Sequence, residues 1–127
     1  MTTTITPAAW VKGTAKASIS LSPSGNNPFT IEGKKTVSFE LFEQLNYHVP
    51  DSIFIPVGDG VILSGVYKGF EDLLRIGLTE KMPVIIAVQS EKSDNLVRNI
   101  SRQAFSIVPS STVADSISVD IPRNFYM

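Results

Sequence analysis

The chain has 127 residues, with 11 basic and 12 acidic side chains and a sequence pI near 5.7. This length suits one domain, and the balanced charge without a basic stripe argues against nucleic acid as a partner. The absence of cysteine excludes disulfides, thiolate zinc sites and cysteine nucleophiles, and it is compatible with a reducing compartment. No apolar run approaches the roughly 18 residues of a membrane span and no signal-peptide pattern is seen, so we expect a cytoplasmic protein without membrane contact.

The N-terminal part of the sequence has the weakest pattern. Residues 1–26 are rich in Thr, Ser, Ala and Gly, and only Ser18–Ser22 alternates polar and apolar residues in a way that predicts a short strand. A turn follows at Pro23–Pro28, and Phe29–Thr36 is interpreted as a loop. We therefore predict one α/β domain over residues 1–127, in which residues 1–26 form a poorly defined segment.

The first predicted helix spans Thr36–Leu45. In it, Val37, Leu41 and Leu45 recur at a spacing of four, which predicts that their face packs inward. A turn at Asn46–Asp51 then leads into the apolar run Ser52–Val57, and such continuous runs are typical of strands that helices cover on both faces.

The rest of the chain alternates helices and strands. Apolar residues at helical spacing follow the glycine turn as far as Gly77, a second apolar strand is expected at Pro83–Val88, and a helix at Asp94–Gln103. The tail contains a short helical or extended piece around Val113–Val119. This alternation predicts the α/β class, as a three-layer parallel sheet flanked by helices and joined by right-handed crossovers.

The turn Gly58-Asp59-Gly60 lies between the buried strand and the next helix, where free backbone N–H groups can hold a phosphate. It does not fit a dinucleotide fingerprint, because Leu63 stands where glycine is needed, nor a P-loop, because Val66-Tyr67 follow Gly65. A tight connection without a ligand is an equal alternative on physical grounds. The Asp59 carboxylate would repel a phosphate unless it points away or caps the helix.

The remaining polar residues give weaker signals. The single histidine, His48, is interpreted as a turn or surface residue. Glu91 and Asp94 have no histidine partner, so no metal site is predicted. Glu71 and Asp72 are interpreted as surface residues exposed to solvent. The lysines Lys34, Lys35 and Lys68 could contact an anion, although a solvated surface position is the simpler role for each.

Four segments in order resemble the central part of threonine synthase and its relatives among the fold-type II pyridoxal phosphate enzymes. The resemblance covers residues 27–123, an interior piece of the length usual in that family. The segments are Asn27-Pro28-Phe29 with Glu32-Gly33-Lys34-Lys35-Thr36; Glu43-Gln44-Leu45 with Pro50-Asp51; Pro56-Val57-Gly58-Asp59-Gly60 with Gly65 and Lys68-Gly69-Phe70; and Val88-Gln89 with Thr112-Val113-Ala114-Asp115.

The resemblance implies a Rossmann-like half of such an enzyme, with residues 27–123 as the core that binds the cofactor phosphate. The implied cofactor-binding residues are Gly58, Asp59, Gly60, Val61 and Ile62, whose backbone would cradle the phosphate of pyridoxal phosphate. Where many relatives carry further Gly or Asn, this sequence has Val61 and Ile62, which keep the backbone donors and lose side-chain contacts.

In that family the lysine that forms the Schiff base lies in an earlier segment, in a Ser-x-Lys-type motif followed by a basic or amide residue. That segment is not found here, since Lys16 lacks its setting. No catalytic residue is therefore predicted, and the chain alone is expected to be inactive. The parent reaction implied is conversion of O-phosphohomoserine and water to threonine and phosphate, with an amino acid as substrate. The open alternatives are a serine or threonine dehydratase, a β-replacement synthase, or a non-catalytic interaction module, and a homodimer is allowed.

Overall fold

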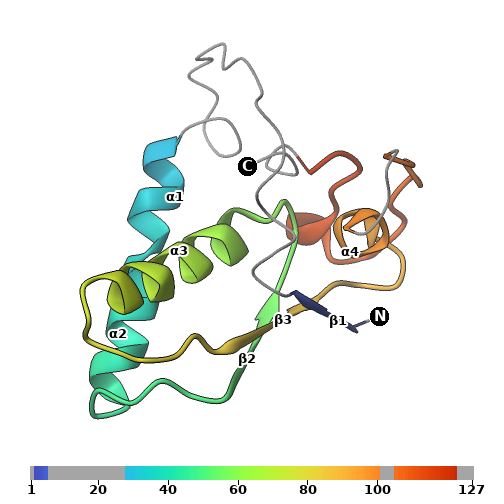
Figure 1. The fold of residues 1–127 in the computed structure, drawn as a ribbon. Coiled ribbons are helices and arrows are strands. Elements are labelled where there is room, and N and C mark those ends of the chain that lie inside the picture. The colour runs from blue at the N-terminus through green and yellow to red at the C-terminus, as the bar shows by residue number, and fades with distance from the viewer. Residues whose placement is uncertain (1, 6–27, 101–104, 123–127) are drawn as a thin grey trace.

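The computed structural model describes residues 2–5, 28–100 and 105–122 (Figure 1). Among these residues a sheet of order β1-β3-β2 packs against helices, with β2 and β3 parallel. The predicted α/β class is therefore confirmed. The elements in chain order are β1 (Thr2–Ile5), α1 (Pro28–Lys34), α2 (Thr36–Gln44), β2 (Ser52–Pro56), α3 (Val61–Arg75), β3 (Val84–Val88), α4 (Asn95–Asn99) and the short 3-10 helix η2 (Asp115–Ile117).

The strand β1 was not predicted. It pairs antiparallel with β3, with Thr2 opposite Val88 and Ile5 opposite Ile85, so the sheet is mixed rather than purely parallel. The sequence Thr-Thr-Thr-Ile favours a strand through its β-branched residues, but four residues are too few to stand out without a partner. The strand predicted at Ser18–Ser22 lies outside the described residues.

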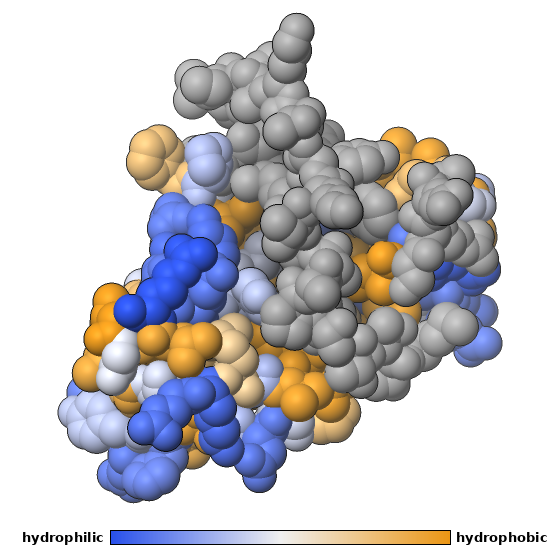
Figure 2. All heavy atoms as spheres, in the orientation of Figure 1, coloured by the Kyte–Doolittle hydropathy of each residue, from blue (hydrophilic) through white to orange (hydrophobic). Residues whose placement is uncertain are grey.

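The two faces of the sheet differ in exposure. Ile55, Ile85 and Ala87 belong to the buried core with residues of α3 and α4, whereas Phe54 is 64% exposed and Val84 is 45% exposed. In the described part of the chain, the helices cover the first face, and the second helical layer expected from the apolar runs is not seen. An apolar run shows that both faces can accept apolar neighbours, and it does not show what covers each. On the view in Figure 2, hydrophobic and hydrophilic residues both reach the surface.

The loop predicted at Phe29–Thr36 is wrong, because residues Pro28–Lys34 form the helix α1. Pro28 occupies the first helical position, where its missing N–H costs nothing. The helix is stabilised by Ile31, which is 2% exposed and packs in the contact between α1 and α3. One buried side chain gives no period, so the pattern could not show this helix.

The predicted helix Thr36–Leu45 is confirmed as α2, which ends at Gln44, but its buried face is displaced by one residue. Val37 and Leu45 are exposed, and Ser38 and Phe42 are buried instead. Ser38 faces α3 because its hydroxyl donates a hydrogen bond to the carbonyl oxygen of Val66 at 2.7 Å. Because the residue at the helix crossing is polar, the apolar pattern did not identify the buried face.

The helix α3 is the central support of the fold, and Figure 1 shows α1 and α2 following one another along one side of it. Two glycines allow this close approach. A Cβ added at Gly65 would lie 2.3 Å from Cβ of Lys34, and one at Gly69 would lie 2.8 Å from the carbonyl oxygen of Lys35. The helix ends as predicted near Gly77, which has a φ of +78°.

We expect Gly65→Ala to lower the free energy of unfolding by about 1–3 kcal/mol, because the new methyl overlaps α1. Gly33→Ala is the matched control: an added Cβ meets nothing within 4 Å there, so the helix should gain roughly 0.5–1 kcal/mol. Urea unfolding measures both. Equal behaviour of the two variants would contradict the close packing at Gly65.

Charged side chains also join α1 and α2 to α3. Lys35 Nζ lies 2.6 Å from both Glu32 Oε2 and Asp72 Oδ2, and Lys68 forms an ion pair with Glu32. Hydrogen bonds from Lys35 and Lys68 lower the pKa of Glu32 below its usual 4.5. Hydrogen bonds to Asp72 and Glu32 raise the pKa of Lys35 above 10.5.

These shifts predict how stability depends on pH. The stabilisation of the folded state by Glu32 is present above about pH 4.5 and is lost as pH falls through the lowered pKa of the folded chain. The stabilisation by Lys35 is lost as pH rises through its raised pKa in the folded chain. We therefore expect Glu32→Gln to flatten the fall in melting temperature between neutral and acidic pH. A profile parallel to that of the unchanged chain would show that the network does not act on stability.

Candidate functional site

The candidate site is the turn that joins β2 to α3. Its entrance is fixed by the sheet, because Val57 donates a backbone hydrogen bond to Val88 at 2.9 Å. Its exit is fixed by Gly60, which has a φ of +91° and immediately precedes the first residue of α3. Residues that carry a side chain rarely adopt this backbone conformation, so glycine is required here. The strand, the glycine turn and the helix follow one another as predicted.

The carboxylate of Asp59, the residue before the N-cap Gly60, is held by the first N–H group of α3. Its Oδ1 accepts a hydrogen bond from the backbone N–H of Val61 at 3.0 Å. The carboxylate is therefore held against the start of α3, which takes one of the free donors there. An anion bound at the turn must accept hydrogen bonds from the other free N–H groups.

Several other backbone donors at the turn stay available. The first hydrogen bond of α3 runs from Ser64 N to Gly60 O at 2.9 Å. Among the residues that the structure describes, no acceptor is found for the N–H groups of Gly58, Asp59, Gly60, Ile62 and Leu63. Five unpaired N–H groups around one turn suit a phosphate, which has several acceptor oxygens and a charge that the positive end of a helix favours.

A side chain that was not predicted also belongs to this region. Ser64 lies in the first turn of α3 and is 7% exposed, and its hydroxyl has no hydrogen-bond partner within the described part of the chain. Helical side chains lean toward the N-terminus of their helix, which for Ser64 is the end at the turn. A buried hydroxyl without a partner is unfavourable unless a ligand or water completes it.

The predicted site residues differ in exposure. Gly58 and Asp59 are partly buried, Gly60 and Val61 are buried, and Ile62 is 46% exposed. The back of the turn is closely packed, since a Cβ on Gly60 would lie 2.8 Å from Leu96 Cδ1. Residues 105–122, which we call the C-terminal segment, reach the same place, where Ile117 Cα would lie 3.4 Å from a Cβ on Gly58.

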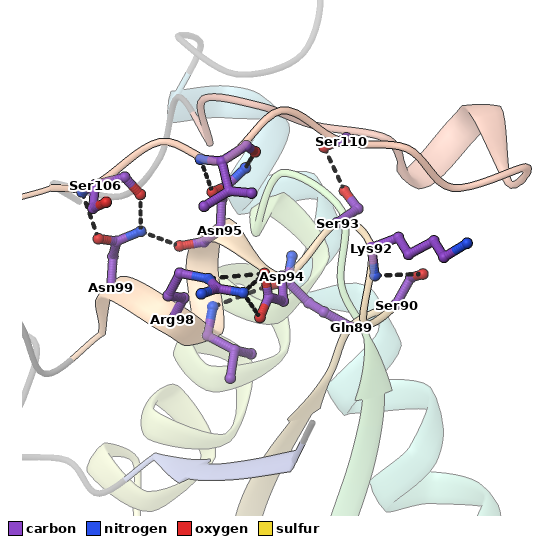
Figure 3. Close-up of polar contacts among 12 residues, drawn as sticks. Gln89, Ser90, Lys92, Ser93, Asp94, Asn95, Arg98, Asn99, Ser106 and Ser110 are labelled. Atoms are coloured by element: carbon purple, nitrogen blue, oxygen red, sulfur yellow. Dashed lines mark hydrogen bonds and ion pairs between the residues drawn. The ribbon is translucent and has the colours of Figure 1, made fainter.

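Two asparagines of α4 hold the C-terminal segment, as Figure 3 shows. Asn95 donates to Val108 O at 2.7 Å and accepts from Val108 N at 2.9 Å. Asn99 donates to Ser106 O at 2.9 Å and accepts from Ser106 N at 2.7 Å. Each amide thus pairs with one residue as a neighbouring strand would. The spacing of four on the helix matches the spacing of two on the extended chain.

Ser93 makes a further set of contacts with this segment, next to Ile117 and the turn. Its hydroxyl lies 2.9 Å from Ser110 Oγ, donates to Ile117 O at 3.2 Å and accepts from Val119 N at 3.2 Å. The carboxylate of Asp120 accepts from Ser110 N, and this backbone hydrogen bond lowers its pKa. The C-terminal segment is therefore held beside the turn by polar contacts and not by regular strand pairing.

We expect Asn99→Ala to destabilise the chain by about 1–3 kcal/mol, because Asn99 is fully buried and the backbone of Ser106 loses both partners. Asn99→Asp should cost at least as much, since it keeps the acceptor for Ser106 N but sets a buried carboxylate oxygen against the carbonyl oxygens of Asn95 and Ser106. Ser116→Ala, at an exposed residue of the same segment, serves as the control. Urea unfolding and limited proteolysis of the segment provide the measurements, and equal results for all three variants would contradict this role.

The other residues considered from the sequence lie away from this chemistry. His48 is exposed in a turn, where Nδ1 lies 2.7 Å from Asn46 O, as predicted. Lys35 and Lys68 are engaged by carboxylates, Glu71 pairs with Arg75, and Asp94 pairs with Arg98. Lys16 is outside the described residues. None of the helices described is both long and apolar enough to cross a membrane.

Comparison with known proteins gives the family. The model of the family described as "Pyridoxal-phosphate dependent enzyme" matches residues 7–126. The chain therefore belongs to this family of pyridoxal-phosphate-dependent enzymes, in agreement with the resemblance found in the sequence.

The individual relatives are threonine synthases. The chain is 38% identical to that of Methanosarcina acetivorans over 77% of its own length, and 32% identical to that of Methanocaldococcus jannaschii over 90%. It is also 27% identical to "Threonine synthase 2, chloroplastic" of Arabidopsis thaliana over 74% of its length. The matched regions are only 25%, 29% and 20% of those three proteins, respectively. The chain thus corresponds to a minor part of each relative.

Proposed function

We propose that the chain is the part of a threonine synthase-like enzyme that holds the phosphate of pyridoxal phosphate. The observation that supports this most directly is the turn from Gly58 to Ile62, where N–H groups without an acceptor in the described residues precede and begin α3. The family membership supplies the cofactor, and the turn supplies a place for its charged end.

The residues present fit a phosphate in three respects. The left-handed Gly60 has no side chain that could occupy the space at the turn, and the Asp59 carboxylate is hydrogen-bonded to Val61 N at 3.0 Å. The hydroxyl of Ser64 is buried without a partner in the described part of the chain, and it can donate to a phosphate oxygen. The proposed role of this chain is therefore to bind and orient the cofactor through its phosphate.

When it is bound, pyridoxal phosphate supplies an electron sink for amino-acid chemistry. The parent reaction that we propose is the formation of threonine and phosphate from O-phosphohomoserine and water. The name of the relatives, threonine synthase, supports threonine as its product. The one Ser-x-Lys in these 127 residues, Ser90-Glu91-Lys92, is followed by Ser93 and not by a basic or amide residue. We therefore propose that this chain by itself does not turn over the substrate. A cytoplasmic location and a homodimer remain predictions.

We expect the chain to bind pyridoxamine phosphate and to bind pyridoxamine, which lacks the phosphate, much more weakly. Pyridoxamine compounds have no aldehyde, so surface lysines cannot react with them and obscure the titration. Ser64→Ala should weaken binding of the phosphate compound about tenfold while leaving the melting temperature unchanged or higher, because an unpaired buried hydroxyl is removed. Isothermal titration calorimetry measures the affinities.

A variant with an added negative charge tests whether the phosphate binds at the start of α3. Ile62 is 46% exposed in the first turn of α3, so Ile62→Glu should be tolerated by the helix but should repel the phosphate. Ile62→Gln, of the same shape without the charge, should bind almost as the unchanged chain does. Equal affinity for the two pyridoxamine compounds would overturn the proposed function, and unaltered binding by Ile62→Glu would place the phosphate elsewhere.

A further inference from the structure

Gln89 is a buried residue that contacts the candidate site from behind. It directly follows β3, is 5% exposed, and lies beside α4 (Figure 3). Its Nε2 donates to Val57 O and to Gly58 O, each at 3.2 Å, and its Oε1 accepts from Val97 N at 2.8 Å. One side chain thus joins the end of β2, the glycine turn and the helix α4.

These contacts fix the amide of Gln89 in one orientation. Its NH₂ group faces two carbonyl oxygens, and its oxygen faces a backbone N–H. Turning the amide over would set an oxygen against two acceptors and an NH₂ group against a donor, so the observed orientation is the only one that satisfies all three neighbours. Both hydrogens and one lone pair of the amide are used. Gln89 therefore has no donor left to offer to an anion.

The consequence for the turn follows from the planarity of the peptide bond. In a trans peptide the carbonyl C=O points opposite to the N–H of the next residue. Holding Val57 O toward Gln89 therefore directs the N–H of Gly58 away from it, and holding Gly58 O does the same for the N–H of Asp59. Both N–H groups are among those without an acceptor in the described residues.

We propose that Gln89 is a positioning residue for phosphate binding, which aims the N–H groups of Gly58 and Asp59 outward by holding the two preceding carbonyl oxygens. This inference rests on the proposed function and adds to it a residue that does not touch the phosphate. Glycine makes the turn flexible in the absence of such support. Preorganised donors bind an anion more tightly than donors that must first be ordered.

The test uses the whole chain and three variants. Gln89→Glu keeps the acceptor for Val97 N but replaces the donor with an oxygen that faces two carbonyl groups. Gln89→Met removes all three hydrogen bonds at a similar volume. Ser38→Ala removes another buried hydrogen bond, the one to Val66 O at 2.7 Å between α2 and α3, and serves as the stability control. Melting temperatures, titrations with pyridoxamine phosphate, and the amide NMR resonances of the two glycines Gly58 and Gly60 are recorded for each.

We expect both Gln89 variants to bind pyridoxamine phosphate about tenfold more weakly and to shift the glycine resonances. Ser38→Ala should lose stability yet retain affinity and resonances. Two results would overturn the proposal. In the first, the affinity falls in proportion to the melting temperature in all three variants; in the second, the Gln89 variants bind pyridoxamine phosphate as tightly as the unchanged chain does. If the unchanged chain does not prefer pyridoxamine phosphate over pyridoxamine, the proposed function fails separately. The glycine resonances then decide alone: displacement confined to the Gln89 variants supports positioning of the turn, and no displacement refutes it.

Discussion

Three buried amide side chains replace the regular strand pairing that this part of the fold lacks. A buried N–H or carbonyl group without a partner costs about 1–3 kcal/mol, so every irregular segment near the core must find acceptors and donors. Gln89 meets this need for the glycine turn, and Asn95 and Asn99 meet it for the C-terminal segment. The candidate site depends on these amides, because the glycine turn and the C-terminal segment beside it both lack regular secondary structure.

The helix α3 imposes the second constraint, since its N-terminus must arrive beside the end of β2. Two contacts determine its axis: Gly65 and Gly69 let α1 and α2 approach on one side, and Phe70 is fully buried in the core on another. A helix fixed along its length presents its first N–H groups in a constant direction. The electrostatic attraction for an anion at the start of α3 therefore depends on packing several turns away.

The sequence was a good guide to elements whose residues repeat and a poor guide to elements held by single contacts. The strands β2 and β3 and the helix α3 have continuous or periodic apolar residues, and each was located within about one or two residues. The helix α1 buries one side chain, Ile31, and was missed, as was the antiparallel strand β1. The helix at Asp94–Gln103 was placed, but α4 is described only over Asn95–Asn99. Tertiary partners decided these cases, and no local pattern encodes them.

The site shows the same division between local and distant information. The turn itself could be predicted, because a glycine after a buried strand and before an apolar helix is a local signal. The roles of Ser64 and Gln89 could not, since a serine in a helix and a glutamine after a strand look like ordinary polar residues. Asp59 shows why this matters: from the sequence its charge opposed a phosphate, whereas in the structure it caps Val61. The affinity of the turn for an anion is therefore set less by its own side chains than by how many backbone donors the surrounding residues leave free and in which direction they hold them.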